Sequence, residues 1–138
     1  MNSRAPARRV TGSLAMVVVT LGLSACGTGG DVAQARSATE RFYAATHQHD
    51  GVTACAQLSP DTRAQLVKDT GKRCATSVLE LSLHGSQPSV VRVYATSAVV
   101  TLAGGDTVFL GDTREGWRIE AVGCKPQHGG PYDCEAQA

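Results

Sequence analysis

The chain has few of the residue patterns on which assignments of activity rest. It contains no Gly-x-Ser-x-Gly elbow, no glycine-rich phosphate loop and no His-Glu-x-x-His motif, so serine hydrolases of that kind, P-loop proteins and zinc peptidases are not indicated. No two acidic residues have the spacing of an acid/base couple. Arginine and lysine form no cluster and the net charge is only +1, so a nucleic-acid partner is not expected. The case for catalysis is weak, and no cofactor is expected.

The sequence also lacks a Cys-x-x-Cys pair, which argues against a zinc ribbon and a thioredoxin-like redox site. Of its five cysteines, four lie beyond Cys26: Cys55, Cys74, Cys124 and Cys134. An even number in a small exported domain favours two disulfides. Three pairings are possible; we favour Cys55–Cys74 and Cys124–Cys134, because each closes a short local loop.

The N-terminus contains an apolar run, Leu14 to Leu23, that is too short to span a membrane, which takes about 20 residues. A basic start precedes it, with Arg4, Arg8 and Arg9, and small residues follow it. This order is typical of an export signal. The ending Leu23-Ser24-Ala25-Cys26 resembles the bacterial lipobox, whose cysteine receives a diacylglyceryl group before cleavage on its N-terminal side. A secretory signal peptidase site fits less well.

We therefore expect a lipoprotein signal peptide at 1–25 and lipidation at Cys26, with the protein anchored on the extracytoplasmic face of the bacterial cell membrane. Removal of 25 residues from 138 leaves 113, enough for one small domain. Residues 26–30 comprise the lipidated cysteine and a glycine-rich tether that reaches about 14 Å at most. The single domain is expected to occupy 31–138.

Helical spacing of small and apolar residues predicts four helices in the first part of this domain. They cover 31 to about 47, 52–58, 60–68 and 72–83, with Gly51 as the stop of the first and Ser59-Pro60 as the start of the third. After Gly85 an alternating pattern predicts strands at 90–95, 98–102, 107–111 and 117–121. The fold class is therefore α+β, with N-terminal helices packed on a C-terminal antiparallel sheet of about four strands.

Several segments together resemble small actinobacterial lipoproteins with an NTF2-like, cystatin-like α+β domain. The segments are Phe42-Tyr43, Ala54 to Pro60, Cys74, Gly116 to Ile119, and the closing Gly123-Cys124 with Pro131 to Cys134. An excess of arginine over lysine suits such a GC-rich genome. The resemblance implies a cone-shaped domain with a helix-lined concavity. Such domains usually have a strand before the third helix, which the sequence does not reveal. The scaffold hosts isomerases, dehydratases, carriers and dimerisation modules, so it implies no single activity.

Aromatic residues are the candidates for lining this concavity. Phe42, Tyr43 and Tyr94 are placed to do so, although such residues more often serve only packing. Trp117 and Phe109 alternate with polar residues and are expected in the core. Phe42, Tyr43 and Tyr94 are therefore the candidate ligand contacts of the sequence.

The histidines give little support to catalysis or metal binding. His47 and His49 are two residues apart, so they do not share a helix face, and we expect them in solvent. His84 could act as a general base with Asp112, but its place before Gly85 favours the surface. We therefore expect no metal site and no catalytic residue.

The sequence favours a non-enzymatic, membrane-anchored domain that binds a membrane or envelope protein or a small apolar ligand. Its first partner is the lipid bilayer, through acylated Cys26. One alternative is an NTF2-like enzyme that uses His84 or a buried carboxylate in the concavity. Another is a structural envelope lipoprotein.

Lipidation can be tested in a bacterial host that is fed labelled fatty acid. The label should enter the protein, and Cys26→Ser should abolish it, because only the cysteine sulfur accepts the diacylglyceryl group. Mature protein that begins elsewhere than at residue 26, or label that persists in the variant, would contradict the assignment.

Overall fold

The computed structural model describes residues 29–138, an α+β domain with the helices before an antiparallel sheet, as the sequence predicts. In this part of the chain the helices are α1 (Gly29–His47), α2 (Gly51–Gln57), α3 (Pro60–Thr70), α4 (Cys74–Ser77) and the 3-10 turn η1 (Val78–Glu80). The strands are β1 (Pro88–Tyr94), β2 (Ser97–Leu102), β3 (Thr107–Thr113), β4 (Gly116–Cys124) and β5 (Ala136–Gln137). They form one sheet in the order β1-β2-β3-β4-β5.

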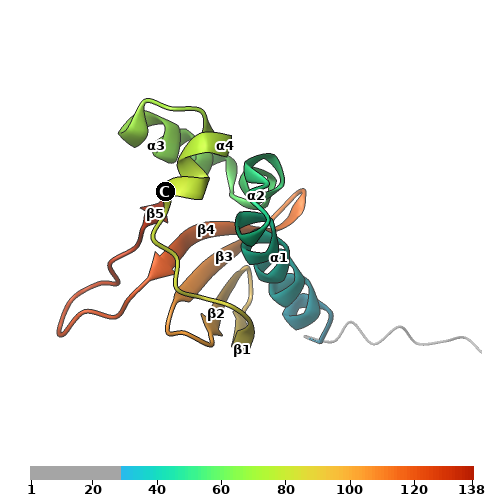
Figure 1. Ribbon diagram of the computed structural model, residues 1–138. Helices are drawn as coiled ribbons and strands as arrows, with labels where there is room; N and C mark the ends of the chain where they lie inside the picture. Colours follow the sequence, from blue (N-terminus) through green and yellow to red (C-terminus); the bar gives the residue numbers. More distant parts are fainter. Residues whose placement is uncertain (1–28) are drawn as a thin grey trace, which may run out of the picture.

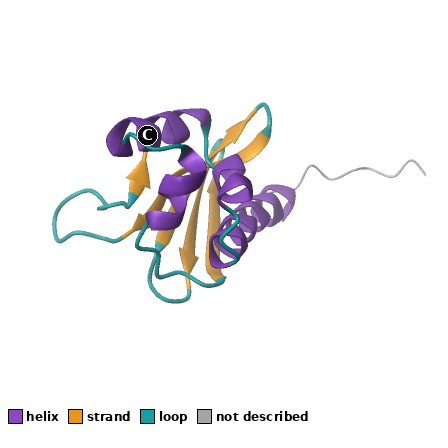
Figure 2. Cartoon of the chain, turned by 45° about the horizontal axis from the view of Figure 1, so that its top comes forward, coloured by secondary structure: helices purple, strands orange, loops and turns teal. Residues whose placement is uncertain are grey.

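Helix α1 lies across one face of this sheet, and α3 lies beside its β4–β5 edge (Figures 1 and 2). Phe42 and Tyr43 of α1 are fully enclosed between the two layers, together with Val100, Leu110 and Ile119 from the sheet. Alternation along the strands sends these side chains to the helical face and their neighbours to the opposite face, which we call the outer face. None of the helices in the described part of the chain is both long and apolar enough to span a bilayer.

The ends of α1 differ from the expectation. The helix begins at Gly29, so Gly29 and Gly30, expected in the tether, form its first turn with Asp31, where an acidic side chain favours the helix dipole. His49, with φ 56°, takes the left-handed position after the helix, so the expected stop at Gly51 is wrong. Gly51 instead begins α2, which Asp50 caps by accepting a hydrogen bond from the N–H of Thr53 at 3.0 Å.

The third helix begins as predicted, with Ser59 as its N-cap, and it continues to Thr70, two residues beyond the expected end, with Gly71 in the left-handed conformation after it. The expected fourth helix is too long, because the chain becomes extended at Leu81. This extension brings His84 and Gly85 to the β2–β3 turn, where the backbone N–H of His84 donates to the Asp106 carboxylate. The hydrogen bond between His84 and Asp106 thus outweighs the helical preference that the spacing of apolar residues indicated.

The last strand is absent from the sequence prediction. β5 has only two residues, and it pairs with Ala121 and Val122 of β4. The disulfide Cys124–Cys134 and a bridge between Lys125 and Asp133 bring the tail back to this edge. Before α3, a single parallel bridge joins Leu58 to Ile119, in the place where the sequence shows no strand.

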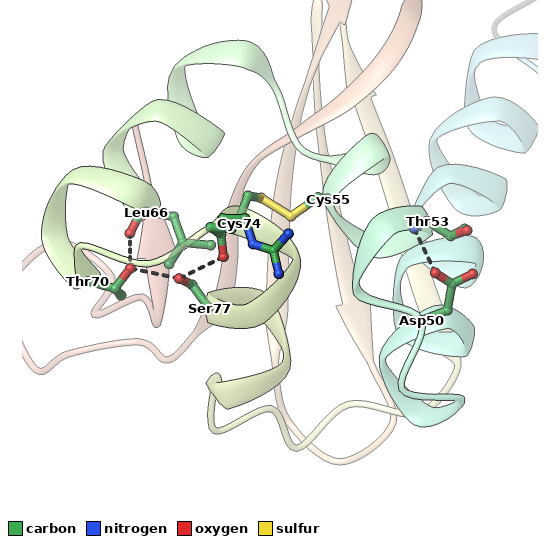
Figure 3. Close-up of a disulfide and its surroundings, with 8 residues drawn as sticks. Asp50, Thr53, Cys55, Leu66, Thr70, Cys74 and Ser77 are labelled. Carbon is green, nitrogen blue, oxygen red and sulfur yellow. Dashed lines mark hydrogen bonds between the residues drawn. A yellow bond between two sulfur atoms is a disulfide. The ribbon is translucent and has the colours of Figure 1, made fainter.

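The other disulfide joins Cys55 of α2 to Cys74 of α4 (Figure 3), so both pairs are the local ones favoured from the sequence. Beside it, the hydroxyls of Thr70 and Ser77 form a hydrogen bond of 2.7 Å. A Cβ on Gly51 would collide with the backbone of Ala75, so α2 and α4 touch backbone to backbone. The Cys55–Cys74 disulfide therefore joins two short helices whose buried residues are mostly small or polar.

Removal of Cys55–Cys74 by a double alanine substitution should lower the free energy of unfolding by about 3 kcal/mol, because the unfolded chain regains loop freedom. The residues it joins are 19 apart, against 10 for Cys124–Cys134, and each doubling of a loop adds about 0.6 kcal/mol. Removal of Cys124–Cys134 should therefore cost about 0.5 kcal/mol less. Urea unfolding of both double variants measures this; a loss below about 1 kcal/mol in the first would contradict it.

Candidate functional site

The domain contains one buried carboxylate that the sequence analysis did not single out, Asp106. It is fully enclosed, and its Oδ2 accepts hydrogen bonds from the Tyr43 hydroxyl at 3.2 Å and from the backbone N–H of His84 at 2.7 Å. Burial, and then the charge of Asp106, raise the pKa of Tyr43 well above its ordinary value. The Tyr43 hydroxyl therefore keeps its proton and acts as a donor.

This network lies in a closely packed region. A Cβ on Gly85 would lie 2.6 Å from the Leu102 side chain and 2.8 Å from the Tyr43 ring, closer than atoms approach without displacement. The Oδ1 atom of Asp106 has no hydrogen-bond partner, and the residue is 0% exposed. The arrangement ties α1 to the sheet.

The aromatic residues expected to line a concavity do not come together. Phe42 and Tyr43 are 0% and 1% exposed inside the core, whereas Tyr94 is 56% exposed on the outer face. The expectation of a shared lining is therefore wrong. The reason is that α1 packs directly on the sheet, and its own aromatic rings fill the space between the layers.

The proposed pair of His84 and Asp112 is not formed either. His84 lies at the β2–β3 turn, and Asp112 lies near the other end of β3, where its N–H donates to Thr96. Six residues of extended chain between Asp106 and Asp112 span about 20 Å. His47 and His49 are exposed, as expected. Among residues 29–138 no group of three or more His, Cys, Asp or Glu side chains is arranged to hold a metal ion.

An open groove of about 690 Å³ lies on the outer face of the described domain, and we call it the outer groove. Phe109 and Ala121, paired between β3 and β4, form its floor. Its walls come from the start of α3 and from the long β4–β5 loop, which projects from the sheet on the side away from α1 (Figure 1). The lining residues are Ser59, Pro60, Asp61, Phe109, Thr113, Glu120, Ala121, Pro131, Tyr132, Cys134, Gln137 and Ala138.

An aromatic pair gives the outer groove its apolar surface. The rings of Phe109 and Tyr132 meet edge to face with centroids 5.0 Å apart, and Tyr132 remains 41% exposed. The disulfide Cys124–Cys134 closes the loop that carries Tyr132. Phe109 was expected in the core, but its neighbours Val108 and Leu110 occupy the helical face. Tyr132 was not proposed as a contact residue at all; its place beside Cys134 was the available signal.

The charged side chains of the outer groove are acidic. Asp61 lies in the first turn of α3, and Glu120 lies on β4. The Glu120 carboxylate occupies the space above Gly111, where a side chain would collide with it. No lysine or arginine is among the lining residues. The outer groove can therefore accept an apolar side chain together with a positive charge.

The Tyr43–Asp106 network predicts a specific response to alkali. Tyr43 holds its proton in the folded chain, whereas the unfolded chain releases it above about pH 10. The free energy of unfolding should therefore fall as pH rises above 10, by up to about 1.4 kcal/mol per pH unit from this group. Urea unfolding between pH 9 and 11 should show a shallower fall in Tyr43→Phe. The exposed control, Tyr94→Phe, should retain the wild-type slope; equal slopes in all three proteins would contradict the prediction.

Comparison of the chain with protein-family models, with curated proteins and with solved structures finds no match in any of the three. The functional argument therefore depends on the geometry above and on the sequence motifs.

Proposed function

We propose that this chain is a lipoprotein on the outward face of a bacterial cell membrane, whose single domain binds an envelope protein in the outer groove. The observation that supports binding is the aromatic pair of Phe109 and Tyr132. A tyrosine that is 41% exposed beside a half-buried phenylalanine presents a large apolar surface to solvent. Aromatic side chains of this kind supply much of the energy of protein interfaces.

The acidic residues of the outer groove favour one kind of occupant. Asp61 and Glu120 line the same groove as Phe109 and Tyr132, so an extended segment with an apolar side chain on the aromatic pair would have its neighbouring residues beside these carboxylates. A basic residue there would gain attraction without a competing cation. We therefore propose a partner segment in which an apolar and a basic residue are neighbours.

The anchor supports a membrane-associated partner. Cys26, the signal peptide 1–25 and the residues before Gly29 lie outside the described part of the chain. From Cys26 to the first residue of α1 the chain covers about 10 Å at most. A domain held this close to a bilayer encounters proteins of that membrane far more often than it encounters a freely diffusing ligand.

The finer fold assignment belongs to the same proposal. Helices that cover one face of an antiparallel sheet are compatible with an NTF2-like domain. The bridge between Leu58 and Ile119 lies before α3, where such domains usually have a strand. We propose an NTF2-like domain of a small actinobacterial lipoprotein whose helix-side concavity is filled by Phe42 and Tyr43.

The proposal can be tested by photo-crosslinking in intact cells. A benzophenone-bearing aromatic residue at position 132 of the full chain should give a discrete adduct with an envelope or integral membrane protein. The same residue at position 94, another exposed tyrosine site away from the outer groove, should give none. Phe109→Ser should lower the yield at 132 about tenfold, because an apolar contact of this size contributes about 1.5–3 kcal/mol.

A longer flexible linker inserted after Gly27 should also reduce the adduct, since it relaxes confinement near the membrane. Equal adducts at 132 and 94 would contradict binding in the outer groove. Co-purification of a small apolar molecule, lost in Phe109→Ser, would replace the protein partner by a small ligand. Turnover of a small molecule by the purified chain would establish the enzyme alternative.

A further inference from the structure

A second hollow lies on the other side of the β3–β4 hairpin from the outer groove. Its volume is about 360 Å³, within the range of pockets that hold a small molecule or a head group. One wall is a single face of α1, formed by residues three or four apart, and the other is the hairpin itself. The lining residues are Ala33, Gln34, Ser37, Arg41, Glu115, Gly116, Trp117 and Arg118, and none of them lines the outer groove.

Two arginines in this hollow are held by neighbours without being neutralised. Arg41 donates from Nε to Gln57 Oε1 at 3.1 Å and from Nη1 to Ser37 Oγ at 2.6 Å. Both acceptors are uncharged, so the guanidinium keeps its full charge and its position. A guanidinium with five donors in a rigid fork suits an oxyanion.

Arg118 is only weakly paired. Its Nη1 donates to the carbonyl oxygen of Trp117 at 3.2 Å, and its Nη2 lies 3.6 Å from the carboxylate of Glu115. The Glu115 side chain is 70% exposed, and an exposed ion pair of this length contributes little. A bound anion can therefore displace Glu115 at low cost. With two arginines and one glutamate, the hollow has a formal charge of +1.

Trp117 is the one aromatic residue among the lining residues. It is 3% exposed, and its indole N–H is enclosed and has no hydrogen-bond partner. Because the indole nitrogen is itself buried, Trp117 reports on the hollow from beneath its surface. The charges of the two arginines favour a negative occupant.

We infer that this hollow binds a phosphate group through Arg41 and Arg118, beside the buried indole of Trp117. Phosphate supplies acceptor oxygens in several directions, which matches donors that come from both a helix and a hairpin. The same chemistry is offered by a free phosphate ester and by an anionic lipid head group. The lipid source alone rests on the proposed function: Gln34 lies within about 20 Å of Cys26 along the chain, so the hollow would lie within reach of the membrane surface.

The single tryptophan of the chain gives a direct readout. In the full chain with Cys26→Ser, which cannot be lipidated, glycerol 3-phosphate should move the one indole N–H resonance along a saturating curve. Arg41→Gln and Arg118→Gln should each weaken this binding at least tenfold. Arg92→Gln, on the outer face of β1, is the matched control and should leave it unchanged.

No saturable shift, or an equal shift in the two hollow variants, would overturn the site. Arg41→Gln also removes the hydrogen bond to Gln57 and could disturb folding. In that case the wild-type titration and the Arg118→Gln variant still test whether the hollow binds phosphate. Acetate that binds as well as glycerol 3-phosphate would overturn the assignment to phosphate.

Vesicles distinguish the two sources of phosphate. A lipid head group is identified if vesicles with phosphatidylglycerol saturate the shift at a tenfold lower phosphate concentration than glycerol 3-phosphate does, and vesicles of phosphatidylcholine alone give no shift. Equal saturation would identify a free phosphate ester. Because Cys26 is replaced, failure of lipidation leaves this test unaffected.

Discussion

The hydrogen bond between the Tyr43 hydroxyl and Asp106 is the contact around which the domain is arranged. It joins residues 63 positions apart and connects α1 to the turn between β2 and β3. Desolvation of a carboxylate is costly unless hydrogen bonds compensate, and the N–H of His84 supplies the second one. Both donors must be in place, so the segment that leads to β1 is drawn against the helix. This packing fills the space between α1 and the sheet around Tyr43, so the two hollows lie away from this network.

Local signals in the sequence predicted much of the fold. Ser59-Pro60 and Gly71 delimit α3 through capping rules that act within a few residues, and alternation located the first four strands. Long-range contacts account for the failures. β5 exists because Cys134 and Val122 place its two residues against β4, and neither residue has a strong strand preference of its own. The helix expected up to Leu83 ends early because Asp106 binds the backbone of His84.

The candidate sites were harder to predict than the elements, since they depend on which face of the sheet each side chain occupies. Phe109 and Val108 are adjacent apolar residues, and alternation alone does not say which of them faces the helices. Register irregularities against β4 lie on both sides of Phe109. The face that each side chain occupies is therefore set by the pairing of the two strands and not by the local sequence. The outer groove also needs Tyr132, which comes near Phe109 only after the Cys124–Cys134 loop has closed. Charge patterning shows no cluster in sequence, yet folding brings Arg41 and Arg118 together from α1 and β4.

The two hollows differ in sign as well as in place. The outer groove holds Asp61 and Glu120 and no cation, whereas the hollow beside α1 holds Arg41 and Arg118. The near-neutral net charge of the chain hides this separation. In a chain anchored at Cys26 as proposed, an anionic membrane surface attracts the arginine side, which is also the side nearest the anchor, and repels the acidic one. Attachment and electrostatics then act in the same sense, and together they leave the outer groove open to an envelope partner.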